Sequence, residues 1–113
     1  MNWLKLESIS DLKQITQQSF SSPVAIFKHS TRCSISSVAK MRLSSSWSLN
    51  DEVPIYYLDL LSYRDVSNLI AEQFGVPHQS PQLLVIKNGD CIYNNSHLSI
   101  SVKDVRQILE IKD

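Results

Sequence analysis

The sequence contains little of three features that would each indicate a particular class of protein. It has only two cysteines, Cys33 and Cys91, in 113 residues, which is too few for a disulfide framework. Its 11 basic and 11 acidic residues balance, and their mixing along the chain argues against binding to nucleic acid or to an anionic membrane surface. No apolar run approaches the length of a membrane-spanning helix, which needs about 20 residues.

The beginning of the sequence and its composition narrow the class further. The segment "MNWLKLESISDLKQ" lacks the charged-then-apolar order of a signal peptide, so we expect a cytoplasmic protein whose cysteines are free thiols. Apolar residues make up 42% of the chain, as in globular proteins. We therefore expect residues 1–113 to form a single domain, as a monomer or a weak dimer.

Short apolar runs that alternate with helical patterns predict a mixed α/β fold. The runs at 24–27, 55–57, 83–86 and 91–93 favour strands, and a further small strand is expected within 2–6. Helical periodicity is found at 8–20, after Cys33, at 62–75 and at 101–113. Strand–helix–strand connections of this length give parallel strand pairs. The order predicts a mixed sheet of four or five strands with helices on both faces.

Local signals predict where several of these elements begin, end and turn. Ser62 and Asp65 have the spacing of a capping box at the start of a helix, and Gly75 is expected to end it. Asn88-Gly89 predicts a type I′ hairpin turn. Two apolar faces are predicted on the first helices, made of Leu12, Ile15 and Phe20 on one and of Ile35, Val38, Ala39 and Leu43 on the other.

Cys33 lies where the first buried strand gives way to a helix. The carboxyl end of a parallel strand followed by a helix N-terminus is a place where ligands and reactive groups collect. The partial positive charge of a helix N-terminus and a neighbouring cation such as Arg32 favour a thiolate. Cys33 is therefore a candidate nucleophile. The alternative is that a small, unreactive residue occupies a turn.

The order of motifs resembles that of the thioredoxin-like superfamily. Cys33 and Ser36 form a Cys-x-x-Ser arrangement after a strand, and Ser80-Pro81 precedes the penultimate strand. The segments "FKHSTRCSIS", "SPQLLVIKNG" and "SHLSI" are similar to those of the monothiol bacilliredoxins, the YtxJ-like proteins of the bacterial bacillithiol system. This resemblance extends over nearly the whole chain and implies a thioredoxin-like fold.

The resemblance also implies an activity, which is thiol–disulfide exchange by one cysteine. The Cys33 thiolate is expected to attack a mixed disulfide between a protein and a low-molecular-weight thiol, to take up the small thiol and to release the protein. Ser36 stands where dithiol relatives have a resolving cysteine, so a second external thiol must complete the reaction; Ser36 either donates a hydrogen bond to the thiolate or is an ordinary hydroxyl of the first turn. Pro81 is expected in cis against Cys33, with the Ser80 backbone free to bind substrate; the alternative is an ordinary trans proline.

Other residues are candidates for binding the small thiol. Lys28 corresponds to a lysine that binds a carboxylate in many glutaredoxins, and its alternative is a solvated lysine at the strand end. Arg32 supports a thiolate and pairs with carboxylates. His97 is expected either to contact substrate from the loop before the last helix or to be a surface residue. His29 is expected to face solvent. Ser34 replaces the proline that commonly follows the cysteine in the family.

Three readings of the whole chain follow. The first is an enzyme, a monothiol oxidoreductase that removes a bacillithiol-type thiol from proteins. The second is a non-catalytic thioredoxin-like binding module, and the third is a redox sensor that is thiolated at Cys33. The spacings of histidine and cysteine match no zinc site, so we expect no metal and no cofactor, with the small thiol as co-substrate. Cys91 is interpreted as a strand residue, with a resolving role as the alternative.

Overall fold

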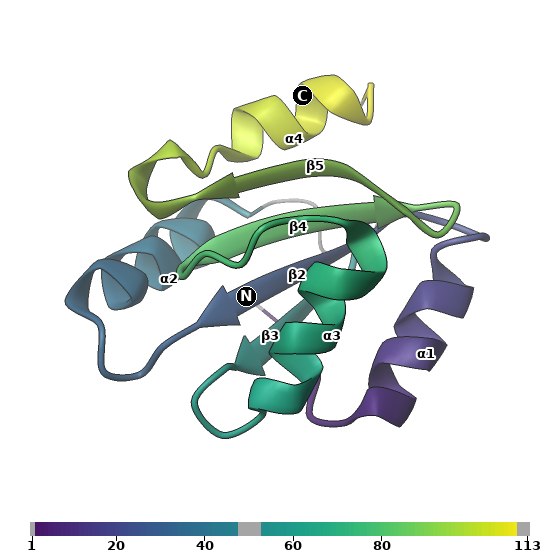
Figure 1. Ribbon diagram of the computed structural model, residues 1–113. Coiled ribbons are helices and arrows are strands. Elements are labelled where there is room, and N and C mark those ends of the chain that lie inside the picture. The colour runs from purple at the N-terminus through teal and green to yellow at the C-terminus, as the bar shows by residue number, and fades with distance from the viewer. Residues whose placement is uncertain (1, 48–52, 111–113) are drawn as a thin grey trace.

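The computed structural model describes residues 2–47 and 53–110, which form strands and helices in alternation followed by a hairpin and a last helix (Figure 1). The elements are β1 Trp3–Lys5, α1 Ile9–Gln18, β2 Val24–His29, α2 Ser34–Ser46, β3 Ile55–Asp59, α3 Arg64–Phe74, β4 Gln82–Lys87, β5 Asp90–Ser96, the 3-10 turn η1 His97–Ser99, and α4 Val102–Ile108. This order confirms the predicted succession of elements. Of the last predicted helix, residues 111–113 lie outside the described residues.

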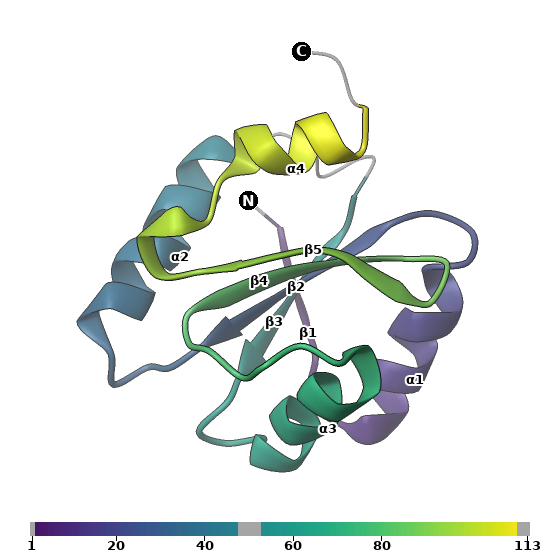
Figure 2. The same ribbon diagram turned by 45° about the horizontal axis from the view of Figure 1, so that its top comes forward.

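The five strands form one mixed sheet in the order β1-β3-β2-β4-β5. β2 lies at its centre, parallel to β3 and antiparallel to β4, while β5 is antiparallel to β4. Helices α1 and α3 cover one face of the sheet, and α2 and α4 cover the other, as both views show (Figures 1 and 2). The predicted fold class, a mixed sheet between two layers of helices, is confirmed.

The core has two parts because successive side chains of a strand point to opposite faces. Along β2, Ala25 and Phe27 pack with α2 and α4, whereas Val24 and Ile26 pack with α1 and α3. All six residues of β2 are buried. A strand buried on both faces is expected to be a continuous apolar run, which explains why this segment stands out in the sequence.

The helix boundaries follow from capping groups, with one correction. The Ser8 hydroxyl accepts a hydrogen bond from the Asp11 N–H at 3.0 Å and starts α1. Gly75 ends α3 in the left-handed conformation, as predicted. The predicted Ser62 cap is wrong, because the Ser62 hydroxyl donates instead to Asp59 Oδ2 at 3.0 Å. The residue that directly precedes α3 is Tyr63, one residue later than predicted.

Parts of the predicted apolar faces are exposed. Ala39 and Leu43 are buried under the sheet as expected, but Ile35 and Val38 on the first turns of α2 are 46% and 45% exposed. Phe20 lies beyond the end of α1 and is also exposed. Helical spacing in the sequence shows which residues share a face, but it does not show how much of that face the neighbouring elements cover. Among the described residues, no helix is long and apolar enough to cross a membrane.

Asn88 and Gly89 form the turn between β4 and β5 and confirm the predicted type I′ geometry. Their φ angles are 54° and 76°, and this turn type requires positive φ at both positions. A Cβ on Gly89 would lie 2.7 Å from the end of the Phe20 ring. Phe20 therefore covers the turn, and only the absence of a side chain at Gly89 leaves room for it.

We predict that Gly89→Ala destabilises the fold more than Gly75→Ala, as measured by urea unfolding. Both glycines have positive φ, but a Cβ on Gly75 meets nothing within 4 Å. Gly75→Ala should therefore cost only the backbone term of about 1–2 kcal/mol, whereas Gly89→Ala adds displacement of the Phe20 ring. The excess should disappear when Phe20 is also replaced by alanine. Equal costs for the two single variants would contradict the assigned Phe20 contact.

Candidate active site

Cys33 is the residue that immediately precedes the first turn of α2. Its backbone is extended (φ −110°, ψ 119°), and its carbonyl accepts the first helical hydrogen bond, from the Ser37 N–H at 3.1 Å. Its side chain is partly exposed and caps no N–H group of the described helix. The sulfur therefore remains available beside the unpaired N–H groups and positive end of the helix, which favour an anion.

The Ser80–Pro81 peptide bond is cis, which confirms the geometry that the family resemblance implied. Pro81 is buried directly before β4, and β4 begins at Gln82, which pairs with Lys28 at the end of β2. The cis proline and the segment that leads to Cys33 therefore lie at the same edge of the sheet. Ser80 is half-buried, and its hydroxyl has no hydrogen-bond partner in the described part of the chain.

Ser36 is buried beneath the first turn of α2, and its hydroxyl is in hydrogen-bond contact with two groups. His29 Nδ1 lies 2.6 Å from Ser36 Oγ, and the Ser30 N–H donates to the same oxygen at 3.1 Å. These contacts tie the start of α2 to the end of β2. A hydrogen bond from Ser36 to a Cys33 thiolate stays a prediction.

His29 corrects the expectation that it faces solvent. It is only 5% exposed, and its ring stacks on Phe27 and contacts Tyr57 at centroid distances of 5.9 and 5.4 Å. Burial lowers the pKa of His29, and the charge of Lys40 acts in the same direction, so the imidazole is neutral at pH 7. His29 is therefore part of the support under Cys33 rather than a surface group.

Lys28 is also placed differently from both sequence interpretations. It is fully buried, on the α3 face of the sheet, and so is neither a solvated lysine nor positioned to meet a carboxylate at the surface. Its ammonium donates to the Ser67 carbonyl at 3.2 Å and to His78 Nδ1 at 3.3 Å. Because an ammonium only donates, it selects the His78 tautomer with the proton on Nε2. Lys28 thus joins β2 to α3 and to the loop before Pro81.

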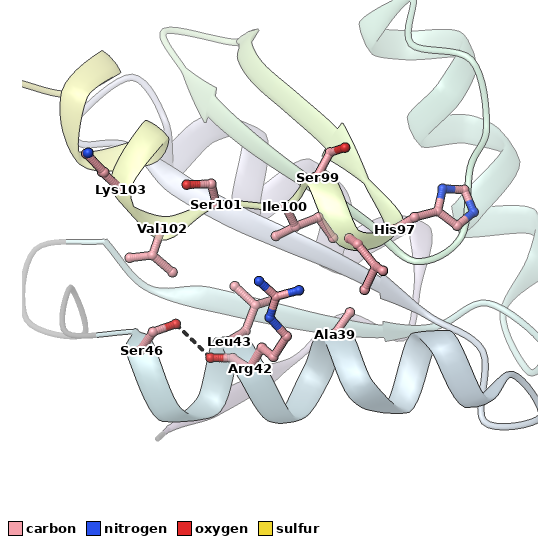
Figure 3. Close-up of a pocket in the computed structure, with 11 residues that line it drawn as sticks. Ala39, Arg42, Leu43, Ser46, His97, Ser99, Ile100, Ser101, Val102 and Lys103 are labelled. Atoms are coloured by element: carbon pink, nitrogen blue, oxygen red, sulfur yellow. Dashed lines mark hydrogen bonds between the residues drawn. The ribbon is translucent and has the colours of Figure 1, made fainter.

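Arg32 and His97 are exposed, as their candidate roles require. Arg32 directly precedes Cys33. The His97 N–H donates to the Pro81 carbonyl at 3.0 Å, which brings η1 to the cis proline. Figure 3 shows the His97 ring at one end of a hollow between α2 and the η1–α4 segment, with Lys103 at the other end. That hollow measures about 280 Å³, and Cys33 is not among the residues that line it.

Asp59, Ser62 and Arg64 lie at the edge of the sheet beside the loop that precedes Cys33, and they were not predicted as site residues. They line a second hollow together with Thr31 and Arg32. A signal for them was present: the carboxyl ends of two neighbouring parallel strands meet at one edge of a sheet, and Asp59 ends β3 in register with His29 at the end of β2.

Cys91 lies at the other end of the sheet. It pairs with Ile86, and Ile86 pairs with Val24 at the beginning of β2. The length of β2 from Val24 to Lys28 is roughly 13 Å, whereas a disulfide requires Cα atoms within about 7 Å. Cys91 Sγ donates to the Tyr93 carbonyl at 3.1 Å, and burial raises the pKa of this thiol. It is not placed to resolve a disulfide at Cys33.

The fold and the cysteine at the start of α2 define a thioredoxin-like oxidoreductase. A solved structure described as having a thioredoxin fold, and assigned as an oxidoreductase without an established activity, is 32% identical to the chain, with a TM-score of 0.83 over 95% of this chain and 93% of that one. The thioredoxin of Malassezia sympodialis is 18% identical (TM-score 0.73, 96% and 90% covered). That of Trypanosoma brucei brucei is 11% identical (TM-score 0.76, 96% and 88% covered). The two thioredoxins support the fold alone.

Within that class, residues 4–105 match the family described as monothiol bacilliredoxin BrxC. The match includes the cysteine, the cis proline and all five strands except the first residue of β1. The chain belongs to this family, which confirms the resemblance stated from its motifs.

We predict that the buried Lys28 contributes a term to the free energy of unfolding that rises with pH. Burial lowers the pKa of Lys28 from 10.5 to about 8, so between these values the unfolded chain binds more protons than the folded chain. The contribution of Lys28 to the free energy of unfolding should therefore rise from pH 8 to pH 10.5, by at most about 3 kcal/mol. Urea unfolding of the wild type and of Lys28→Met over this range measures the difference.

The matched control for this measurement is Lys87→Met, which removes an exposed lysine from the other end of β4. Subtracting its profile corrects for the general effect of losing one positive charge. A wild-type minus Lys28→Met difference that stays flat or falls between pH 8 and pH 10.5 would show that the folded state does not lower the pKa of Lys28.

Proposed function

We propose that the chain is a monothiol thiol–disulfide oxidoreductase that removes a bacillithiol-type thiol from protein mixed disulfides through Cys33. The observation that carries this proposal is the placement of a partly exposed Cys33 at the start of α2, at the edge of the sheet that holds the cis Ser80–Pro81 bond. The other cysteine lies at the opposite end of the sheet. The oxidoreductase fold and the family match support the same chemistry.

The reaction takes place in two exchanges. In the first, the Cys33 thiolate attacks the sulfur of the small thiol in the mixed disulfide; a Cys33–small-thiol disulfide forms, the old disulfide bond breaks, and the protein leaves as a thiolate. In the second, a free thiolate attacks the small-thiol sulfur on Cys33, giving a small disulfide and regenerating the Cys33 thiolate. In the net reaction the protein sulfur is reduced to a thiolate, and the external thiol is oxidised as it becomes half of the small disulfide.

The residues around Cys33 support the first exchange by position. The backbone of Ser80, directly before Pro81, binds the extended segment of the substrate protein that carries the modified cysteine. Ser36 holds the first turn of α2 through its contacts with His29 and Ser30. Arg32 stabilises the thiolate, and His97 contacts the substrate from η1.

The proposal includes the cellular setting that the resemblance implies. The protein acts in the cytoplasm as a monomer or weak dimer, on thiolated proteins, with a small thiol as co-substrate and without a bound cofactor or metal. Thiols are maintained there in reduced form, so the reductant for the second exchange is at hand.

A second candidate function is a binding module or a redox sensor that is thiolated at Cys33 without turnover. The exposed Ile35 and Val38 favour it, because they extend an apolar surface from the first turns of α2 beside Cys33. Such a surface suits partner docking. Turnover separates the two candidates, since a module or sensor takes up one small thiol and stops.

We predict that Cys33→Ser abolishes release of the small thiol from a bacillithiolated reporter protein, while Cys91→Ser retains the wild-type rate within about twofold. The reason is that only Cys33 presents its sulfur at the edge of the sheet that holds the cis proline. Release is followed by mass spectrometry of the reporter in the presence of free bacillithiol. Loss of activity in Cys91→Ser alone, or retention in Cys33→Ser, would overturn the assignment.

A single-turnover measurement tests the monothiol mechanism. Without free thiol, the wild type should gain the mass of one bacillithiol at Cys33 and then stop, because no second cysteine resolves the disulfide. Added bacillithiol should remove this mass at a rate proportional to its concentration. Removal at a rate independent of added thiol would point to an internal resolving group and against this mechanism.

A further inference from the structure

A polar hollow of about 380 Å³ opens beside the loop that precedes Cys33. It is lined by Thr31, Arg32, Asp59, Leu61, Ser62 and Arg64. Its two sides are the loop before Cys33 and the loop from β3 to α3, which are joined by a hydrogen bond from the Leu60 N–H to the His29 carbonyl at 3.1 Å. Arg32 directly precedes Cys33, and one residue spans at most about 3.6 Å, so the lining of the hollow begins one residue before the cysteine, which is not itself part of the lining.

The hollow carries two positive charges and one negative charge. Arg32 and Arg64 are exposed, and neither has a hydrogen bond or ion pair with another residue in the ranges 2–47 and 53–110. Asp59 is held in place, since its Oδ1 accepts from the Leu61 N–H at 3.2 Å and its Oδ2 from the Ser62 hydroxyl at 3.0 Å. The two guanidinium groups are therefore free to bind a ligand, beside a carboxylate of fixed position.

Arg64 also relates the hollow to the cis-proline loop. The pKa of His78, three residues before Pro81, is lowered by burial, by the charge of Lys28 and by that of Arg64. Arg64 is thus close enough to the loop to act on it electrostatically. The hollow is thus related to the proposed reaction site in two ways: Arg32 directly precedes Cys33, and the charge of Arg64 acts on His78 in the loop that leads to Pro81.

We propose that this hollow binds the small-thiol half of the mixed disulfide and selects thiols that carry two carboxylates and one ammonium group. Arg32 and Arg64 bind the carboxylates, for which guanidinium groups offer paired donors, and Asp59 binds the ammonium. The net charge of the lining, +1, matches the net charge of such a ligand, −1. This inference rests on the proposed function, because it concerns the ligand of the same cysteine.

The hollow between α2 and the η1–α4 segment suits this ligand less well. It carries the cations Arg42 and Lys103 but no acidic side chain among its lining residues (Figure 3). A thiol bound there has no group for its ammonium. Arg42 is nevertheless useful, because it provides an exposed arginine of the same charge for a control variant.

The test compares three reporter disulfides that share one protein and differ in the small thiol: bacillithiol, cysteamine and 2-mercaptoethanol. Arg64→Gln should raise the KM for the bacillithiol disulfide about tenfold and leave kcat unchanged, while the KM for the 2-mercaptoethanol disulfide stays the same. Arg64→Lys should recover part of the loss. Asp59→Asn, which removes the negative charge and keeps one of the two acceptor oxygens, should weaken cysteamine relative to 2-mercaptoethanol. Arg42→Gln is the matched control and should change none of these values.

Equal effects of Arg64→Gln on all three disulfides, or no effect on any, would overturn the proposed selectivity. A separate titration keeps the site testable if the chain does not turn over these substrates. The S-methyl ether of bacillithiol, added to the Cys33→Ser chain, should shift the amide NMR signals of Ser62 and Arg64 in a saturable way that Arg64→Gln weakens. Absence of turnover with saturable binding refutes the oxidoreductase proposal alone; turnover without saturable binding refutes the binding site alone.

Discussion

The structure depends on the burial of β2 at the centre of the sheet. This strand pairs with β3 on one side and β4 on the other, and helices cover both of its faces. Its position determines where its carboxyl end emerges, and Cys33 follows that end by four residues. The antiparallel pairing with β4 brings Pro81 to the same edge, and the parallel pairing with β3 brings Asp59 there. One strand thus gathers the cysteine, the cis proline and the acidic residue.

The polar end of β2 supports the site from both faces of the sheet. Lys28 points to the α3 face and binds Ser67 and the loop before Pro81, whereas His29 points to the other face and contacts Ser36 at the start of α2. Burying a polar group costs free energy unless the group forms hydrogen bonds. These contacts therefore hold the two segments around Cys33 in fixed positions. Lys28 thus joins the central strand to the loop before Pro81, and His29 joins it to the start of α2. The proposed chemistry depends on the positions of both segments.

The separation of the two cysteines is consistent with a reaction by one thiol. Cys33 is at the active edge of the sheet, and Cys91 is at the far end, in a hydrogen bond with its own strand. Ser36, the serine of the Cys-x-x-Ser arrangement, has its hydroxyl in contact with His29 and Ser30. Under the proposed function no internal disulfide forms, so an external thiol completes the reaction, and the proposed site in the neighbouring hollow binds the small-thiol half of the mixed disulfide.

Local sequence patterns predicted the order of strands and helices, the Asn88-Gly89 turn, the end of α3 at Gly75 and the cysteine at a helix start, because each depends on neighbouring residues alone. The family motifs added the cis geometry of Pro81. The burial of Lys28 and His29, the exposure of Ile35, and the meeting of Asp59 and Arg64 with Arg32 were decided by the tertiary structure. Those features depend on which strands pair and which faces the helices cover, and such contacts join residues far apart in the chain.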